Sequence, residues 1–81
     1  MDSGGLVMNV SQKIQYCRTL RNLTQDEVGN LLHVSRKTIS GWETGRSSPD
    51  ILSLVKLCNL FDISLDDLLC DELMIDRDYH G

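Results

Sequence analysis

The sequence predicts an all-α domain built from five short helices. Apolar residues recur at helical spacing in five segments, and residues that typically start or end helices separate these segments. No segment shows the alternation of apolar and polar residues that is typical of a strand. The chain has 81 residues, of which 41% are hydrophobic and 25% charged, and this composition is typical of one small domain with a single core.

The chain divides into three parts. Residues 1–9 are expected to form a flexible leader because they are rich in small side chains and lack a helical period. Residues 10–70 carry the helical domain, and residues 71–81 form either an acidic tail or a partner-binding extension. Since no apolar run exceeds three residues, the sequence contains no membrane span or signal peptide, and we expect a cytoplasmic protein that binds no membrane.

The first predicted helix covers about residues 11–21. Val10, Ile14 and Cys17 recur at helical spacing and form its buried side. Asn22 follows this helix and tolerates the left-handed conformation that ends many helices.

The second helix begins with a capping box, in which Thr24 and Glu27 satisfy free backbone amides. Gly29 lies inside this helix, where glycine costs about 1 kcal/mol relative to alanine, and it indicates that another backbone approaches closely there. The side chains expected to face the core are Val28, Leu31 and Leu32.

A turn at His33 and Val34 leads to a third helix, for which Ser35 is the predicted N-cap. Gly45 supplies the left-handed residue that ends this helix. Its inward-facing residues are Ile39 and Trp42.

The start of a fourth helix is marked by Ser48 as N-cap, Pro49 as first helical residue and Asp50 in the first turn. Its inner face is expected to hold Ile51, Leu54, Val55, Cys58 and Phe61. Ser64 then opens a fifth helix. The residues of this last helix that are expected to close the core are Leu65, Leu68 and Leu69.

Charge is distributed unevenly along the chain, whose net charge is −4. Residues 1–48 hold six cations and four anions and carry +2, whereas residues 49–81 hold two cations and eight anions and carry −6. This asymmetry favours a polyanion as partner of the N-terminal half. An ordinary acidic cytosolic surface is the alternative interpretation.

The three cysteines, Cys17, Cys58 and Cys70, are odd in number, widely spaced and without a CxxC pair. A metal or redox site with His33 or His80 is one interpretation, and small apolar side chains of a reduced protein are the one we favour. We therefore expect no metal and no cofactor. We also expect no enzyme, because the sequence shows no Gly-rich phosphate loop, no spaced carboxylate pair and no nucleophile with a base.

Residues 25–46 are the most informative segment and read QDEVGNLL, HVS and RKTISGWETGR. Two short amphipathic helices flank a three-residue turn, an arrangement with which small proteins place the second helix in the major groove of DNA. Arg36 and Lys37 begin that second helix, and the fork of an arginine can bond guanine O6 and N7 together. A pair of solvated cations on an exposed helix is the alternative interpretation.

The run LTQDEVGNLLHVSRKTISGWETGRSSPDILSLVKLCNLFDISLDDLL resembles the Xre/Cro-type, lambda-repressor-like DNA-binding domains, and the resemblance covers about Ser11–Leu69. It implies base reading from the outward face of the third helix by Arg36, Lys37, Ser40 and Gly41. The residues expected to bind DNA phosphates are Gln25, Ser35, Thr44 and Arg46. The resemblance also implies a structural ion pair between Arg18 and Glu43.

The sequence departs from the family pattern at three positions. His33 replaces a turn glycine, Gly29 replaces a common alanine, and Gly41 replaces a longer polar side chain on the outward face. Base reading from position 41 is therefore the weakest of the implied contacts.

The resemblance implies a sequence-specific DNA-binding transcriptional regulator from a bacterium, phage or mobile element, more often a repressor. It would bind double-stranded DNA as a homodimer on a pseudo-palindromic operator, with half-sites about 34 Å apart. The apolar residues open to either the dimer contact or the core are Leu52, Leu60, Leu73, Met74 and Ile75. The alternative is an antitoxin-like protein-interaction module whose acidic C-terminal half binds a basic protein. The sequence does not identify a small-molecule or protein effector.

Overall fold

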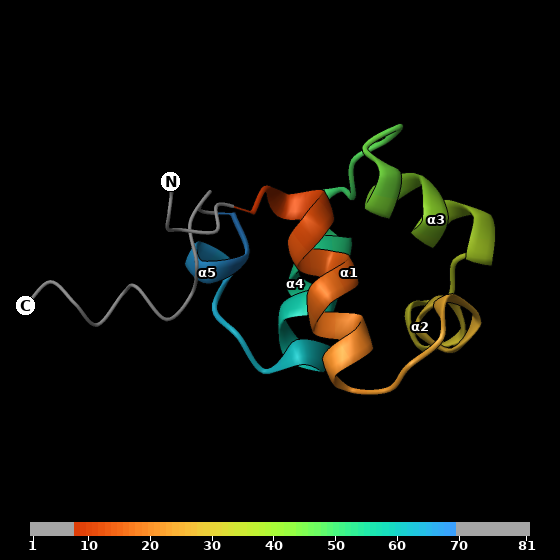
Figure 1. The fold of residues 1–81 in the computed structure, drawn as a ribbon, viewed down its shortest axis with the longest axis horizontal. Helices are drawn as coiled ribbons and strands as arrows, with labels where there is room; N and C mark the ends of the chain where they lie inside the picture. The colour runs from red at the N-terminus through yellow and green to blue at the C-terminus, as the bar shows by residue number, and fades with distance from the viewer. Residues whose placement is uncertain (1–7, 70–81) are drawn as a thin grey trace, which may run out of the picture.

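Residues 8–69 are described by the computed structural model, which folds them into five helices (Figure 1). The helices are α1 (Val10–Leu20), α2 (Gln25–Leu32), α3 (Arg36–Thr44), α4 (Ile51–Phe61) and α5 (Leu65–Leu69). No strand occurs among residues 8–69, and the predicted all-α fold of five helices is confirmed. Several predictions fall outside the described residues: most of the leader, the tail over residues 71–81, Cys70, Leu73, Met74, Ile75 and His80.

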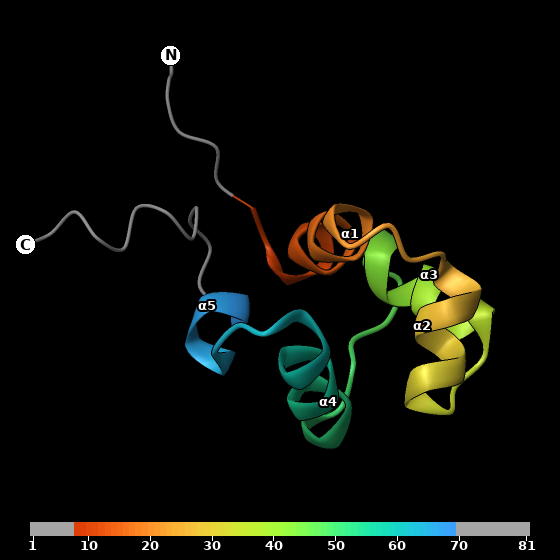
Figure 2. The same ribbon diagram turned by 90° about the horizontal axis from the view of Figure 1, so that it is seen from below.

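The helices are arranged around α1. Figures 1 and 2 show α2 and α3 together on one side of α1, and α5 on the opposite side. α1 contacts α3, α4 and α5, while α4 also contacts α2 and α5. The two long helices α1 and α4 therefore form the support on which the α2–α3 pair is held.

The core draws side chains from all five helices. Its buried apolar residues are Ile14, Cys17, Val28, Leu32, Ile39, Trp42, Leu57, Cys58, Phe61 and Leu68. Burial raises the pKa of the Cys17 and Cys58 thiols, so both stay protonated and pack as small apolar groups. Within residues 8–69 no cluster of three His, Cys, Asp or Glu side chains could hold a metal ion, and no helix is long and apolar enough to cross a membrane.

Side-chain caps fix the starts of α1 and α2. The predicted capping box of α2 is confirmed, because the Thr24 hydroxyl accepts from the Glu27 backbone amide at 3.0 Å and the Glu27 carboxylate accepts from the Thr24 amide at 2.8 Å. A second capping box, missed by the sequence analysis, joins Asn9 and Gln12 at the start of α1. Asn22 has a φ of 56° and thus the left-handed conformation predicted for it.

The turn between α2 and α3 lies where it was predicted. His33 ends α2 with a φ of 63°, a left-handed conformation that costs energy for a residue other than glycine. Ser35 is the N-cap of α3, since its hydroxyl accepts from the Thr38 backbone amide at 3.1 Å. Gly45 ends α3 with a φ of 80°.

The close approach predicted at Gly29 is present. A Cβ atom at this position would lie only 2.7 Å from the carbonyl oxygen of Val34 and 3.4 Å from the carbonyl carbon of Ser35. The approaching backbone is that of the turn itself. Gly29 therefore sets how near the turn and the first turn of α3 can lie to α2.

In α2 and α5, two apolar residues predicted to face the core are instead exposed. Leu31 is 55% exposed and Leu69 is 48% exposed. Leu31 stands on the flank of α2 beside the stripe formed by Val28 and Leu32, which is too narrow to include it. α5 has only five residues and buries one of them, Leu68, so Leu69 on its neighbouring side is only half covered.

The start and the inner face of α4 also differ from the prediction. Asp50 is the N-cap, because its carboxylate accepts from the Ser53 amide at 3.0 Å, and the helix begins two residues later than Pro49. Ile51 and Val55 are exposed, whereas Leu57, which the sequence analysis left out, is buried. The predicted burial of Cys58 and Phe61 is confirmed and Leu54 is half-buried.

Two cations, Lys13 in α1 and Arg21 at the C-cap of that helix, bind the backbone of the C-terminal helices. Lys13 is fully buried, and its ammonium donates to the carbonyl oxygen of Asp67 in α5 at 2.8 Å. Arg21 donates to the carbonyl oxygen of Phe61 at the end of α4, and its guanidinium lies 5.8 Å from the centre of the Phe61 ring. Lys13 is therefore not part of the exposed positive surface that the charge count suggested for the N-terminal half, whereas Arg21 stays exposed.

Candidate nucleic-acid interface

The outward face of α3 carries two exposed cations on its first turn. Ser35 caps the helix, so Arg36 and Lys37 are its first two residues, and both side chains are exposed. Ile39 and Trp42 lie on the opposite side of the helix and are 0% and 5% exposed. Burial of these two apolar residues turns the two cations away from the core.

A shallow hollow follows this face. It has a volume of about 340 Å³ and is lined by Gln25, Arg36, Lys37 and Ser40. Three of these residues belong to α3 and the fourth is the first residue of α2. The structure thus brings together Arg36, Lys37 and Ser40, which were expected to read bases, and Gln25, which was expected to bind phosphate.

Gly41 does not lie on the outward face, and that prediction is wrong. The residue is buried beneath the loop that follows α3, because its carbonyl oxygen accepts from the amides of Arg46 and Ser47 at 2.9 and 3.3 Å. A Cβ atom at position 41 would lie 2.9 Å from the Ser47 hydroxyl oxygen. Glycine is favoured here by the close loop, and this residue cannot present a side chain to any ligand.

The expected ion pair between Arg18 and Glu43 is present. Arg18 Nε and Nη2 donate to the two carboxylate oxygens of Glu43 at 2.7 and 3.0 Å, and Nη1 donates to the carbonyl oxygen of Leu23 at 2.8 Å. The Glu43 side chain is only 3% exposed. The hydrogen bond to Glu43 raises the pKa of the Arg18 guanidinium further, so the pair stays charged and ties α1 to α3.

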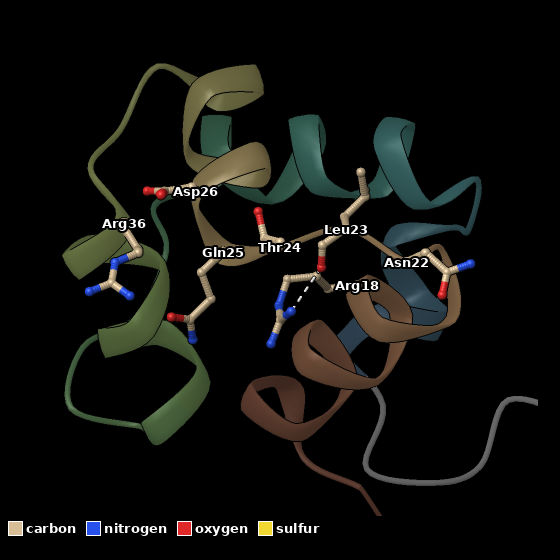
Figure 3. A pocket seen from close by; sticks show the side chains of 7 residues that line it. All are labelled: Arg18, Asn22, Leu23, Thr24, Gln25, Asp26 and Arg36. Atoms are coloured by element: carbon tan, nitrogen blue, oxygen red, sulfur yellow. Dashed lines mark hydrogen bonds between the residues drawn. The ribbon is translucent and has the colours of Figure 1, made fainter.

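Gln25 is bound to the same carboxylate. Its Nε2 atom donates to Glu43 Oε1 at 3.0 Å, and the residue is half-buried. Figure 3 shows Gln25 reaching from the start of α2 toward α3, with Arg36 on one side and Arg18 on the other. Glu43 therefore connects α1, α2 and α3 through three hydrogen bonds.

A second hollow lies beside the first and has a volume of about 430 Å³ (Figure 3). Gln25 and Arg36 line both hollows. The remaining residues that line the second one are Arg18, Asn22, Leu23, Thr24 and Asp26. The sequence analysis did not name Asn22, Thr24 or Asp26 as site residues. Their position in the sequence, within three residues of Gln25 at the start of α2, could have identified them.

The other residues expected to bind phosphate differ in what they can donate. Arg46 is exposed in the loop after α3. Ser35 is also exposed, and its hydroxyl lies 3.0 Å from that of Thr38. The Thr44 hydroxyl donates to the Ser40 carbonyl oxygen at 3.0 Å, so its only hydrogen is already used and it must rotate before it can donate to a phosphate.

Comparison with known proteins places this geometry in a family. A family profile described as helix-turn-helix matches residues 14–68. The HTH-type transcriptional activator BcrR of Enterococcus faecalis is 40% identical over 68 residues, which cover 84% of this chain and 33% of that protein. The uncharacterized HTH-type transcriptional regulator YqaE of Bacillus subtilis is 34% identical over 62 residues, which cover 76% of this chain and 53% of that protein. The chain thus spans about a third of BcrR and about half of YqaE.

A solved structure agrees with the sequence comparisons. The P22 c2 repressor protein, crystallised in complex with a synthetic operator, matches with a TM-score of 0.73 and 27% sequence identity over 76% of this chain and 94% of that chain. Its fold is the fold described above. The chain therefore belongs to the Xre/Cro-type, lambda-repressor-like helix–turn–helix family, a family of DNA-binding transcription regulators and not of enzymes.

Proposed function

We propose that this chain is a DNA-binding domain that inserts α3 into the major groove of double-stranded DNA and regulates transcription, as a repressor. The observation that carries the proposal is the exposure of Arg36 and Lys37 on the first turn of α3, opposite the buried Ile39 and Trp42. In helix–turn–helix proteins the N-terminal residues of the second helix contact base edges. Repression follows if a domain bound at an operator blocks access of the polymerase.

Arg36, Lys37 and Ser40 are the proposed base-reading residues. A guanidinium can donate to guanine O6 and N7 together, and one such bidentate contact discriminates by about 1–3 kcal/mol. Lys37 reaches the same acceptors as a point charge. Ser40 is half-buried in the floor of the hollow and adds a short group that can donate or accept.

Arg46 and Ser35 are the proposed phosphate contacts, and Thr44 joins them once its hydroxyl rotates. Both Arg46 and Ser35 are exposed at the two ends of α3, so they would meet the backbone on either side of the groove that holds the helix. Gln25 lines the same hollow, and its resemblance to the family's phosphate-binding glutamine assigns it to the phosphate contacts as well.

We also propose that two copies bind together. A single recognition helix reads few base pairs, and proteins with this architecture pair across a two-fold axis on half-sites about 34 Å apart. Leu52, which is 60% exposed on α4, is the apolar side chain within residues 8–69 that we propose for this contact. Leu60 is half-buried against the core and is less available.

The test is selection of bound sites from a random DNA pool, followed by salt titration on the selected site. We expect a pseudo-palindrome whose affinity falls steeply with salt, because cations that contact phosphates release counterions. Arg36→Ala should remove about 1–3 kcal/mol of preference at one base pair, whereas Arg46→Ala should weaken all sequences about equally and lower the salt slope by about 1.

Lys56→Ala on α4 is the matched control, since it removes one cation that lines neither hollow, and it should change neither the preference nor the affinity. Recovery of no DNA sequence by the folded protein would end the proposal. Uniform loss of affinity in both arginine variants would leave DNA binding standing but overturn the assignment of roles.

A further inference from the structure

The loop that follows α3 lies over the place where Gly41 has no side chain. The backbone amides of Arg46 and Ser47 donate to the Gly41 carbonyl oxygen at 2.9 and 3.3 Å, and these two bonds hold the loop against the helix. A Cβ atom at position 41 would lie 2.9 Å from Ser47 Oγ, closer than a carbon and a hydroxyl oxygen normally approach. Ser47 can therefore hold this position only because residue 41 is a glycine.

The Ser47 hydroxyl completes the outer surface of α3 above Gly41. Because it is so near the Cβ position, Ser47 Oγ occupies the space into which the longer polar side chain that is usual in the family at position 41 would extend. Lys37, four residues before Gly41, and Thr44, three residues after it, are both exposed. The loop thus supplies a polar group between them, where the helix itself supplies none.

This hydroxyl is available to a ligand. Ser47 is exposed, and within residues 8–69 its side chain makes no hydrogen bond. The hydroxyls of Ser35 and Thr44, by contrast, are already engaged with other groups of α3. The Ser47 hydroxyl can therefore donate or accept without first breaking a contact inside the domain.

The place of the Ser47 hydroxyl favours a base edge over a phosphate. The major groove is about 12 Å wide and admits one α-helix, so a short group held against the outer surface of that helix meets base edges rather than the backbone. The Ser47 side chain is short, and its own backbone amide fixes it to α3. Arg46 Nη2 lies 3.9 Å from the same Cβ position, and this nearby cation favours an acceptor atom on the base.

We propose that Ser47 is a specificity-determining residue, whose hydroxyl takes the place of the absent side chain at position 41 and donates to an acceptor atom of one base in the major groove. Guanine O6, thymine O4 and the purine N7 atoms are the acceptors of this kind. The inference rests on the proposed function and deepens it. It gives Gly41 the role of admitting the loop, and it leaves Arg46 among the phosphate contacts.

The first test removes the hydroxyl alone. Binding of Ser47→Ala is measured on the selected operator and on a panel in which each base pair is changed in turn. We expect a loss of about three- to tenfold in the preference at one position, the value of one hydrogen bond, with the other positions unchanged. Ser48→Ala changes the next exposed serine of the same loop and is the matched control, so it should leave the preferences unchanged.

The second test removes the space that Ser47 needs. In Gly41→Ala the new methyl group displaces the Ser47 hydroxyl, so the preference at the same position should fall by the same factor. The double variant Gly41→Ala/Ser47→Ala should lose no more than either single variant, because both changes remove one contact. Losses that multiply in the double variant would show that the two residues act independently and would overturn the inference.

A third measurement needs neither DNA nor a variant. In the free wild-type protein the α-protons of Gly41 should show a nuclear Overhauser contact to the β-protons of Ser47, since the serine side chain lies against the glycine. Absence of this contact would remove the geometry on which the inference rests.

Uniform weakening of all sequences by Ser47→Ala would make Ser47 a phosphate contact and overturn the inference while the proposed function stands. An unchanged binding profile for Ser47→Ala would overturn it as well. Failure of the wild-type protein to select any DNA would instead remove the proposed function itself.

Discussion

α3 and α4 have similar lengths, nine and eleven residues, but different interactions hold them in place. α3 carries only two apolar side chains, Ile39 and Trp42, and both are buried. Hydrogen bonds to its N-cap Ser35 and its ion pair through Glu43 complete its attachment. The sequence of α4, ILSLVKLCNLF, is apolar around nearly its whole circumference, and its attachment depends on burying part of that surface.

This difference shows how the number of apolar side chains in a helix fixes its rotation about its own axis. With two apolar residues, only one rotation of α3 buries both, and the same rotation turns Arg36 and Lys37 outward. In α4 several rotations would bury an apolar stripe of similar size. The observed rotation of α4 buries Leu57 and Phe61 and leaves Ile51 65% exposed.

The largest expected effect on stability comes from the buried apolar surface of α4. Phe61→Ala removes a fully buried ring from α4 and should lower the free energy of unfolding by about 3–5 kcal/mol. Urea titration followed by the fluorescence of Trp42 measures it. Ile51→Ala on the same helix is the control and should change stability by less than about 0.5 kcal/mol. Similar losses in the two variants would contradict the orientation described for α4.

Arg18→Met tests the ion pair with Glu43 that attaches α3. This change leaves the Glu43 carboxylate buried without its cation and should lower the free energy of unfolding by about 3 kcal/mol. The loss should be accompanied by local loosening of α3, seen as faster amide hydrogen exchange in α3 than in α4. Uniform acceleration along the chain would instead show that the ion pair supports the whole core.

The contact between α2 and the turn gives a smaller effect. Gly29→Val places a branched side chain where a Cβ atom alone would lie 2.7 Å from the Val34 carbonyl oxygen, and we expect a loss of about 2 kcal/mol. Thermal unfolding followed by circular dichroism measures it. Asn30→Val, on the exposed neighbour in the same helix, controls for the change in helix propensity. If both variants unfold at the same temperature, the close approach at Gly29 has no consequence for stability.

The smallest effect concerns the cap of α4 and appears only in acid. Hydrogen bonds from the hydroxyl and backbone amide of Ser53 lower the pKa of the Asp50 carboxyl below its ordinary value of about 3.9. Because the folded-state pKa is the lower one, this stabilisation is present above pH 4 and is lost as the pH falls through the folded-state pKa. Asp50→Asn, which still caps the helix, should therefore lose less stability than wild type between pH 5 and pH 2 in calorimetry. Parallel curves for the two proteins would contradict this role of Asp50.

The parts of the fold that follow from the sequence are those set by neighbouring residues. The capping box of Thr24 and Glu27, the cap at Ser35 and the left-handed residues Asn22 and Gly45 each depend on groups within a few positions of one another. Such local contacts are readable because their geometry is the same in any protein. Local rules fail where two patterns fit equally well, as at Ser48-Pro49-Asp50, where either Ser48 or Asp50 is an acceptable N-cap.

Other features depend on residues far apart in the chain, and only the tertiary structure decided them. Lys13 binds the Asp67 carbonyl across 54 positions, and Gln25 binds Glu43 across 18. Gly41 is buried because the loop after α3 folds back over it, and no periodicity in α3 reveals that. The sequence alone determined which helices form and that Arg36 and Lys37 begin α3. Packing decided which polar side chains face one another, because burial of a charge is acceptable only where a distant partner meets it.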